Sequence, residues 1–189
     1  MLDKLDFISA AILDTQTTIR AIDVKVAALL VGILAPLPNI NRIFSHLNHF
    51  GVQSPRWLFC GVVVLFLLSW LLALLALVRA IGGIDNPDQH IINTSNCRGI
   101  FYAGGLYTLG IVDVFLNRNI IKASKDLQLF AAQLPANETE IETELVFEQM
   151  KLAYIRDVKL NRLHWGLRFS LLWLVLGIGI FLSSKYIIF

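Results

Sequence analysis

The feature that most constrains this chain is an apolar run, "WLFCGVVVLFLLSWLLALLALV", over residues 57–78. Its 22 residues include no charged side chain, and its main polar side chain is that of Ser69. About 20 consecutive helical residues are enough to cross the hydrocarbon core of a bilayer. We therefore expect residues 57–78 to form a membrane-spanning helix.

The C-terminal stretch, "FSLLWLVLGIGIFLSSKYIIF" over residues 169–189, predicts another span. Lys185 lies near its end and can extend to the headgroups, and Tyr186 suits the bilayer interface. The composition agrees with a membrane protein, because 56% of the 189 residues are hydrophobic and 16% are charged. A typical soluble domain has about 25% charged residues.

Residues 26–44 are harder to assign. The apolar part, Val26 to Leu37, has only 12 residues, a length also typical of a buried core helix. Pro36 and Pro38 interrupt the stretch, although prolines are tolerated in membrane helices when neighbours satisfy the freed carbonyls. We expect a span here, because it gives the more consistent distribution of positive charge.

With three spans, residues 1–25 and 79–168 share one side of the membrane, and a loop at 45–56 lies on the other. The first side holds 13 of the 16 Lys and Arg residues. Positive charge marks the cytosolic side of membrane proteins. The sequence thus predicts a cytosolic N-terminus, a cytosolic 79–168 region and an external C-terminus.

The N-terminal segment, residues 1–25, carries apolar residues at alternating spacings of three and four, which predicts an amphipathic helix with a heptad-type stripe. Packing against other helices of the same chain explains such a stripe, and so does a seam between copies. Both interpretations stay open at the level of sequence. The stripe consists of Leu5, Ile8, Ile12, Thr15, Ile19, Ile22 and Val26.

A long helix is predicted from Asn137 to the C-terminus. Asn137 and Glu140 resemble a capping box, and no proline follows before Phe189. The helix would have about 50 residues, at 1.5 Å per residue. Its first half forms a cytosolic stalk within the 79–168 sensor region, and its second half is the last span.

Enzymatic function has little support, so we expect no catalytic residues. The sequence has no Ser-His-Asp signature, no HExxH and no phosphate-binding loop. Cys60 and Cys97 are far apart and lack metal-ligand spacing, so we expect no metal and no disulfide. A formal net charge of +2 gives no argument for DNA or RNA as a partner.

Charged residues at the membrane entrance are better candidates for a functional role. Lys25 has no acidic neighbour on its own helix, because Asp23 is two residues away and points to a different side. Lys25 should therefore find an anion at the interface: a lipid phosphate, Asp157 or a ligand phosphate. The basic series on the long helix is explained by anchoring at the cytosolic surface, and also by an anion pocket completed by Arg98, Lys122 and Lys125. Both interpretations stay open at the level of sequence. The series consists of Arg156, Lys159, Arg162 and Arg168.

Three segments together resemble the transmembrane effectors of the bacterial Pycsar antiphage system and their stand-alone relatives. They are "AIDVKVAALLVG" before the first span, "NCRGIFYAGGLY" after a loop, and "ELVFEQMKLAYIRDVKLNRLHWGLRFSLLW" leading into the last span. With the strong second span, these segments cover most of the chain in the family's order. The positions that fall on family motifs are Asp23, Lys25, Phe101, Glu148, Gln149 and Lys159.

The resemblance implies a bacterial inner-membrane effector. A partner cyclase would make a cyclic nucleotide during phage infection, and the effector would sense it and disrupt the membrane. We therefore expect an all-α, three-span membrane protein, acting as a homo-oligomer among membrane lipids, with a cyclic nucleotide as its only small ligand. The candidate ligand-binding residues are Asp23, Lys25, Arg98, Phe101, Lys122, Lys125, Asp157 and Lys159.

Two other functions remain open. A non-catalytic membrane-anchored scaffold would use its cytosolic helices to bind a protein partner. A small transporter or channel subunit is less consistent with the sequence, because the well-defined spans contain no ionisable residue that would mark a transport path.

Overall fold

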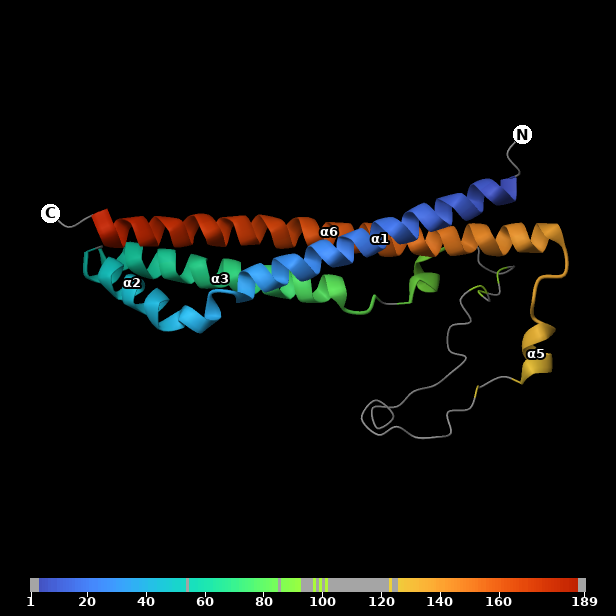
Figure 1. Cartoon of the computed structure of the whole chain (residues 1–189), viewed down its shortest axis with the longest axis horizontal. Coiled ribbons are helices and arrows are strands. Elements are labelled where there is room, and N and C mark those ends of the chain that lie inside the picture. The colour runs from blue at the N-terminus through green and yellow to red at the C-terminus, as the bar shows by residue number, and fades with distance from the viewer. Residues whose placement is uncertain are drawn as a thin grey trace. The chain divides into compact units, whose positions relative to one another are not determined.

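The computed structural model describes residues 4–53, 55–84, 86–92, 97, 99, 101, 123 and 126–186. Every regular element among these residues is a helix, as the sequence predicts (Figure 1). Three of the helical stretches are long and apolar enough to cross a membrane, which indicates a membrane protein. The elements are α1 (Lys4–Leu34), η1 (Leu37–Asn39), α2 (Ile40–Gln53), α3 (Arg56–Ile81), η2 (Pro87–His90), α5 (Leu127–Ala131) and α6 (Glu138–Tyr186).

The chain divides into two compact units, and α1 and α6 each contribute to both. We call one of them the polar unit; it contains Met1–Gln16 and Asn86–Tyr154. The other, which we call the membrane unit, contains Thr17–Asp85 and Ile155–Phe189. The apolar parts of α1, α3 and α6, which form the predicted spans, all belong to the membrane unit.

Helix α6 begins where the capping box predicts. The Asn137 side-chain oxygen accepts a hydrogen bond from the Glu140 N–H at 2.9 Å, and the Glu140 carboxylate accepts one from the Ala136 N–H at 3.0 Å. These bonds satisfy donors that have no partner inside the helix. The helix then continues for 49 residues without interruption, which confirms the predicted length.

The N-terminal stripe of α1 is buried. Ile8, Ile12 and Thr15 are covered in the first half of the helix, and Ile22 and Val26 are covered in the second. This burial favours packing within one chain over a seam between copies at these positions. In the membrane unit, Ile22 and Val26 belong to an apolar core with residues from α3 and α6, namely Ala73, Leu77, Ala80 and Leu163.

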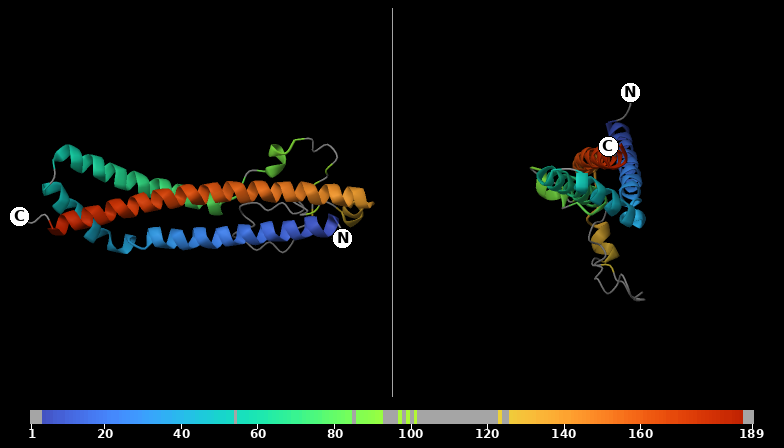
Figure 2. Two further views of the ribbon diagram at one scale, coloured as in Figure 1. Left: turned by 90° about the horizontal axis from the view of Figure 1, so that it is seen from above. Right: turned by 90° about the vertical axis from the view of Figure 1, so that its left-hand side faces the viewer.

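Helices α3 and α6 pack closely in the membrane unit (Figure 2). Gly166 makes this approach possible, because a Cβ atom there would lie 2.6 Å from Leu77 Cδ2. Further along the two helices, the rings of Phe66 and Trp173 lie 5.8 Å apart. Large apolar side chains cover the outer surface, as expected where helices face lipid; they include Leu67, Leu71, Leu171, Leu174 and Val175.

The stretch predicted as a single span at 26–44 is broken. Helix α1 ends at Leu34, a short 3-10 turn follows, and α2 begins at Ile40. The cause is local: Pro36 and Pro38 lack the N–H groups that would continue the helix. Helix α2 then runs to Gln53, so the predicted loop at 45–56 is helical over most of its length.

Candidate functional site

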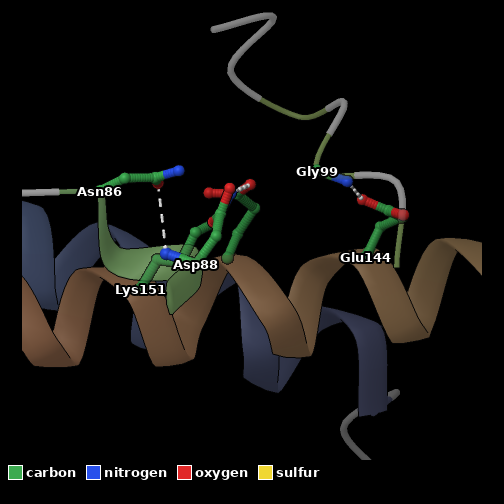
Figure 3. A network of polar contacts seen from close by, with 6 residues as sticks. Asn86, Asp88, Gly99, Glu144 and Lys151 are labelled. Carbon is green, nitrogen blue, oxygen red and sulfur yellow. Dashed lines mark hydrogen bonds and ion pairs between the residues drawn. The ribbon is translucent and has the colours of Figure 1, made fainter. Parts of the chain in front are cut away.

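The polar unit contains a cluster of charged side chains around α6, which we call the Glu148 cluster (Figure 3). Its members are Glu144, Glu148 and Lys151 from α6, and Asp88 from η2. The spacing of three and four residues places the three α6 side chains on one face of that helix. The cluster therefore combines three carboxylates with one ammonium group.

Glu148 is the most buried member, with 1% of its surface exposed. Its Oε1 atom forms a close ion pair with Lys151 Nζ. Burial raises the pKa of the Glu148 carboxyl above its usual range, and the Lys151 ammonium offsets part of that rise.

Lys151 links the cluster together. Its side chain is 12% exposed, and its Nζ lies 3.6 Å from Asp88 Oδ1 and 4.5 Å from the centre of the Phe147 ring. The ring face attracts the ammonium through the negative side of its quadrupole. Because buried charges are stable only when paired, Lys151 is the cation that allows Glu148 to be covered.

Asp88 is placed by the local chemistry of η2. Pro87 starts this turn, and the Asn86 side-chain oxygen accepts a hydrogen bond from the Asp88 N–H at 3.2 Å. At the end of the same turn, the His90 ring stacks on Tyr154 of α6, with the ring centres 4.6 Å apart. Two contacts thus attach η2 to α6, one through charge and the other through aromatic stacking.

Glu144 connects α6 to Gly99. Its Oε2 atom accepts a hydrogen bond from the Gly99 N–H at 3.0 Å, and Gly99 has a φ of 64°. This left-handed conformation favours glycine, since other residues adopt it with strain. Partial burial raises the pKa of the nearby Cys97 thiol, and the negative charge of Glu144 adds to that rise.

Of the predicted site residues at the membrane entrance, the structure brings one pair together and leaves the others apart. Asp23 and Lys159 form an ion pair at 2.5 Å, between α1 and α6 of the membrane unit. Asp157 instead pairs with Arg156, its neighbour in sequence, at 2.9 Å. Lys25 is exposed and forms no ion pair with any described residue.

The other predicted site residues lie in a different part of the chain. Phe101 is one of the residues that the structure describes; its side chain is exposed, and it belongs to the polar unit. Arg98, Lys122 and Lys125 lie outside the described residues. The basic pocket that these three would complete therefore stays a prediction.

Sequence reasoning identified Glu148 only through the family resemblance, and it missed Asp88, Glu144 and Lys151. The signal for Glu144, Glu148 and Lys151 was present, because their spacing repeats one helical face. The pairing of Asp88 with Lys151 joins positions far apart in sequence, so no local pattern marks it.

Known proteins give no further guide to the Glu148 cluster. Comparison with protein-family models, with curated proteins and with solved structures finds no match. The chemistry of the cluster must therefore be judged from its own atoms. In the described part of the chain, no three His, Cys, Asp or Glu side chains are arranged to hold a metal ion.

The cluster is suited to a ligand that donates hydrogen bonds. Carboxylates accept two or more hydrogen bonds each, so the Glu148 carboxylate, paired with one ammonium, can accept further donors. Amino and ring N–H groups of a nucleobase are donors of this kind, as in the contacts of Asp and Glu with cytosine N4. The His90–Tyr154 pair adds aromatic surface, and aromatic rings stack on bases of any sequence.

Proposed function

We propose that this protein is a bacterial antiphage effector of the inner membrane. It senses a cyclic nucleotide through its polar unit and permeabilises the membrane as a homo-oligomer. The observation that carries the proposal is α6: one uninterrupted helix bears both the Glu148 cluster and a stretch apolar enough to span a bilayer. The protein acts by binding and not by catalysis.

In this proposal the Glu148 cluster recognises the nucleobase. A base that donates a hydrogen bond to Glu148 competes with the Lys151 ammonium for this carboxylate. The ligand also changes the balance between Glu148 and Lys151, because a donor at Glu148 weakens its hold on the ammonium. Lys151 is then free to turn toward a phosphate of the same ligand.

The signal reaches the bilayer through α6. An α-helix is stiff over its length, since every interior residue is fixed by a backbone hydrogen bond. A shift of the Glu148 cluster must therefore be accommodated by the helix or by its packing at Gly166 and Leu77. Three helices from one chain do not enclose an aqueous path, so permeabilisation requires several copies.

The proposed topology follows the distribution of charge. The N-terminus and residues 79–168 face the cytosol, and the C-terminus faces outward. The cyclase product is made in the cytosol, so the polar unit lies on the side where the nucleotide appears. Lys25, exposed at the membrane entrance, is in the right place to bind a lipid phosphate.

Dye release from proteoliposomes tests the proposal. The purified protein is reconstituted with a trapped fluorescent dye, and a panel of cyclic mononucleotides is added to vesicles in which the polar unit faces outward. We expect one nucleotide to bind and to release the dye. Glu148→Ala should abolish both effects, whereas Glu138→Ala, at an exposed position of the same helix, should change neither.

Two outcomes would contradict the proposal. The first is that no nucleotide binds, while a protein captured from the host binds tightly and in fixed stoichiometry; this result supports the membrane-anchored scaffold. The second is that a nucleotide binds and the vesicles stay intact, in which case the protein senses without permeabilising.

A further inference from the structure

Helix α2 carries a stripe of polar side chains along its surface. At 100° per residue, Asn41, Arg42, Ser45, Asn48 and His49 fall on one face of the helix, and all five are exposed. The opposite face is apolar and holds Leu47 and Phe50, which are buried in a core with Phe66 of α3 and Ile180 of α6. We call the exposed face the polar stripe.

The break before α2 lies beside the middle of α3. The uncharged part of α3 runs between Arg56 and Arg79, and Leu67 lies midway between them. Pro36, Leu37 and Ile40 line one hollow together with Leu67. Since Arg56 and Arg79 mark the two surfaces of the bilayer, the break is at the depth of the bilayer centre.

Contacts on the other side of the break agree with this depth. The carbonyl oxygen of Ile33, in the last turn of α1, accepts a hydrogen bond from the indole N–H of Trp70 at 3.4 Å. Trp70 is a single helical turn from Leu67 on α3. The Ile33 carbonyl is thus satisfied within the protein, as buried backbone must be.

Helix α2 crosses the outer half of the bilayer and does not lie flat on its surface. Its start lies beside Leu67, and Phe50 near its end lies 6.2 Å from Phe59, ring centre to ring centre. It thus advances along α3 toward Arg56. His46 of α2 also bonds to Ser184 at 2.9 Å, near the external end of α6.

The polar stripe therefore extends from the bilayer centre to the external surface. Charged side chains inside a membrane nearly always face a water-filled cavity or a partner, because lipid does not solvate them. Interrupted backbone at this depth follows the same rule: it is tolerated where protein or water covers it. Pro36 and Pro38 leave the carbonyls of Gly32 and Leu34 without their usual helical donors.

We propose that the polar stripe lines a water-filled path enclosed by further copies of this chain, in the outer half of the membrane. The inference rests on the proposed permeabilising function and names the surface that carries it. Arg42 is the deepest charge of the stripe and gives the path a preference for anions, as basic rings do in other pores. The copies meet at α2, and not at the stripe of α1, which is buried in the chain itself.

Cysteine accessibility tests the location of the path. In a parent with Cys60→Ser and Cys97→Ser, single cysteines are placed at Ser45 of the stripe and at Val64, an exposed apolar position in the outer half of α3. A charged, membrane-impermeant thiol reagent is added to proteoliposomes in which the external end of α3 faces outward. Ser45→Cys should react about tenfold faster or more than Val64→Cys, because the reactive thiolate forms in water and not in lipid.

Ion selectivity gives a second measurement. In a salt gradient, the leak of the unmodified protein should favour anions, and Arg42→Glu should reverse the sign of its reversal potential. Arg56→Glu, at the mouth of the path, should shift the potential much less. A leak whose selectivity is the same in Arg42→Glu and in the unmodified protein would overturn the inference.

These outcomes separate the inference from the proposed function. If a nucleotide releases dye while Ser45→Cys reacts as slowly as Val64→Cys, the effector function stands and the path is elsewhere. If Ser45→Cys reacts fast in vesicles that no nucleotide makes leaky, the water-filled surface is supported and nucleotide gating is wrong.

Discussion

The two halves of α6 share one continuous backbone but bury different kinds of side chain. In the polar unit, the helix buries Glu144 and Glu148. In the membrane unit it buries Leu163 and exposes Leu171 and Val175. A buried carboxylate needs a cation beside it, whereas an apolar side chain facing lipid needs no partner. The stability of the first half should therefore depend on charge, and that of the second half on shape.

The largest expected loss of stability follows from removing a buried charge. Lys151→Met removes the ammonium beside Glu148 and leaves a covered carboxylate without its cation. Breaking a buried pair in this way costs about 3 kcal/mol or more in the free energy of unfolding. Denaturant unfolding of the detergent-solubilised protein, followed by hydrogen exchange in residues 138–154, measures the loss.

Lys4→Met is the matched control in the same unit. Lys4 pairs with Glu142, but its side chain is 69% exposed, and exposed pairs contribute roughly 0–1 kcal/mol. Equal losses in Lys151→Met and Lys4→Met would show that the Glu148 cluster is not the charged core of the polar unit.

The next largest loss of stability is expected from overpacking the contact between α3 and α6. Gly166→Ala places a methyl group against Leu77, which is fully buried, and overpacking of this kind costs about 1–3 kcal/mol. Gly179→Ala should be neutral or slightly stabilising, because nothing lies within 4 Å of the added atom. Thermal unfolding monitored by circular dichroism compares the two variants.

A second substitution sharpens this test. Leu77→Ala alone leaves a cavity, but combined with Gly166→Ala it makes room for the added methyl group. The double variant should therefore be more stable than the sum of the two single changes predicts. Strict additivity would mean that Gly166 and Leu77 are not in contact.

A smaller effect is expected at the pair of Asp23 and Lys159. Asp23 is 40% exposed, so water and salt screen the interaction. A double-mutant cycle with Asp23→Asn and Lys159→Met should give a coupling energy of about 0.5–1 kcal/mol, falling at high salt. A coupling that does not change between low and high salt would contradict this assignment.

The smallest effect concerns pH. The pKa of Glu148 is higher in the folded protein than in the unfolded chain, because burial disfavours the charged form and Lys151 compensates only in part. The folded state then binds the proton more tightly, so the stability from this group is full below the unfolded pKa and is lost as the pH rises through the folded pKa.

Glu148→Gln removes that dependence. The stability of the unmodified protein relative to this variant should fall as the pH rises from the usual carboxyl range toward neutrality. Unfolding curves at a series of pH values measure the difference. Parallel pH profiles for the two proteins would show that Glu148 does not titrate differently on folding.

Local patterns predicted much of this fold. The capping box at Asn137 fixed the start of α6, and the apolar run at 57–78 lies within α3. The heptad spacing identified the buried face of α1, including Ile12 and Val26. Each of these signals acts over a few neighbouring residues, so the sequence displays it directly.

The missed features depend on distant partners or on competing local signals. Nothing near Asp88 in sequence shows that it meets Lys151, and nothing near Asp23 shows that it pairs with Lys159. Residues 45–53 were expected to belong to the loop between two spans, but their spacing is that of an amphipathic helix whose apolar face holds Leu47. The loop was predicted from the positions of the flanking spans and not from the periodicity of these residues, which is helical.

In the proposed function, one continuous helix, α6, carries the signal from the Glu148 cluster to the bilayer. Asn161 is an exposed position of α6 between the two, and Asn161→Pro removes a helical hydrogen bond there and kinks the helix. Nucleotide-triggered dye release should be lost in Asn161→Pro and kept in Asn161→Ala, while both variants insert in the membrane and bind the nucleotide. Full dye release by Asn161→Pro would contradict the claim.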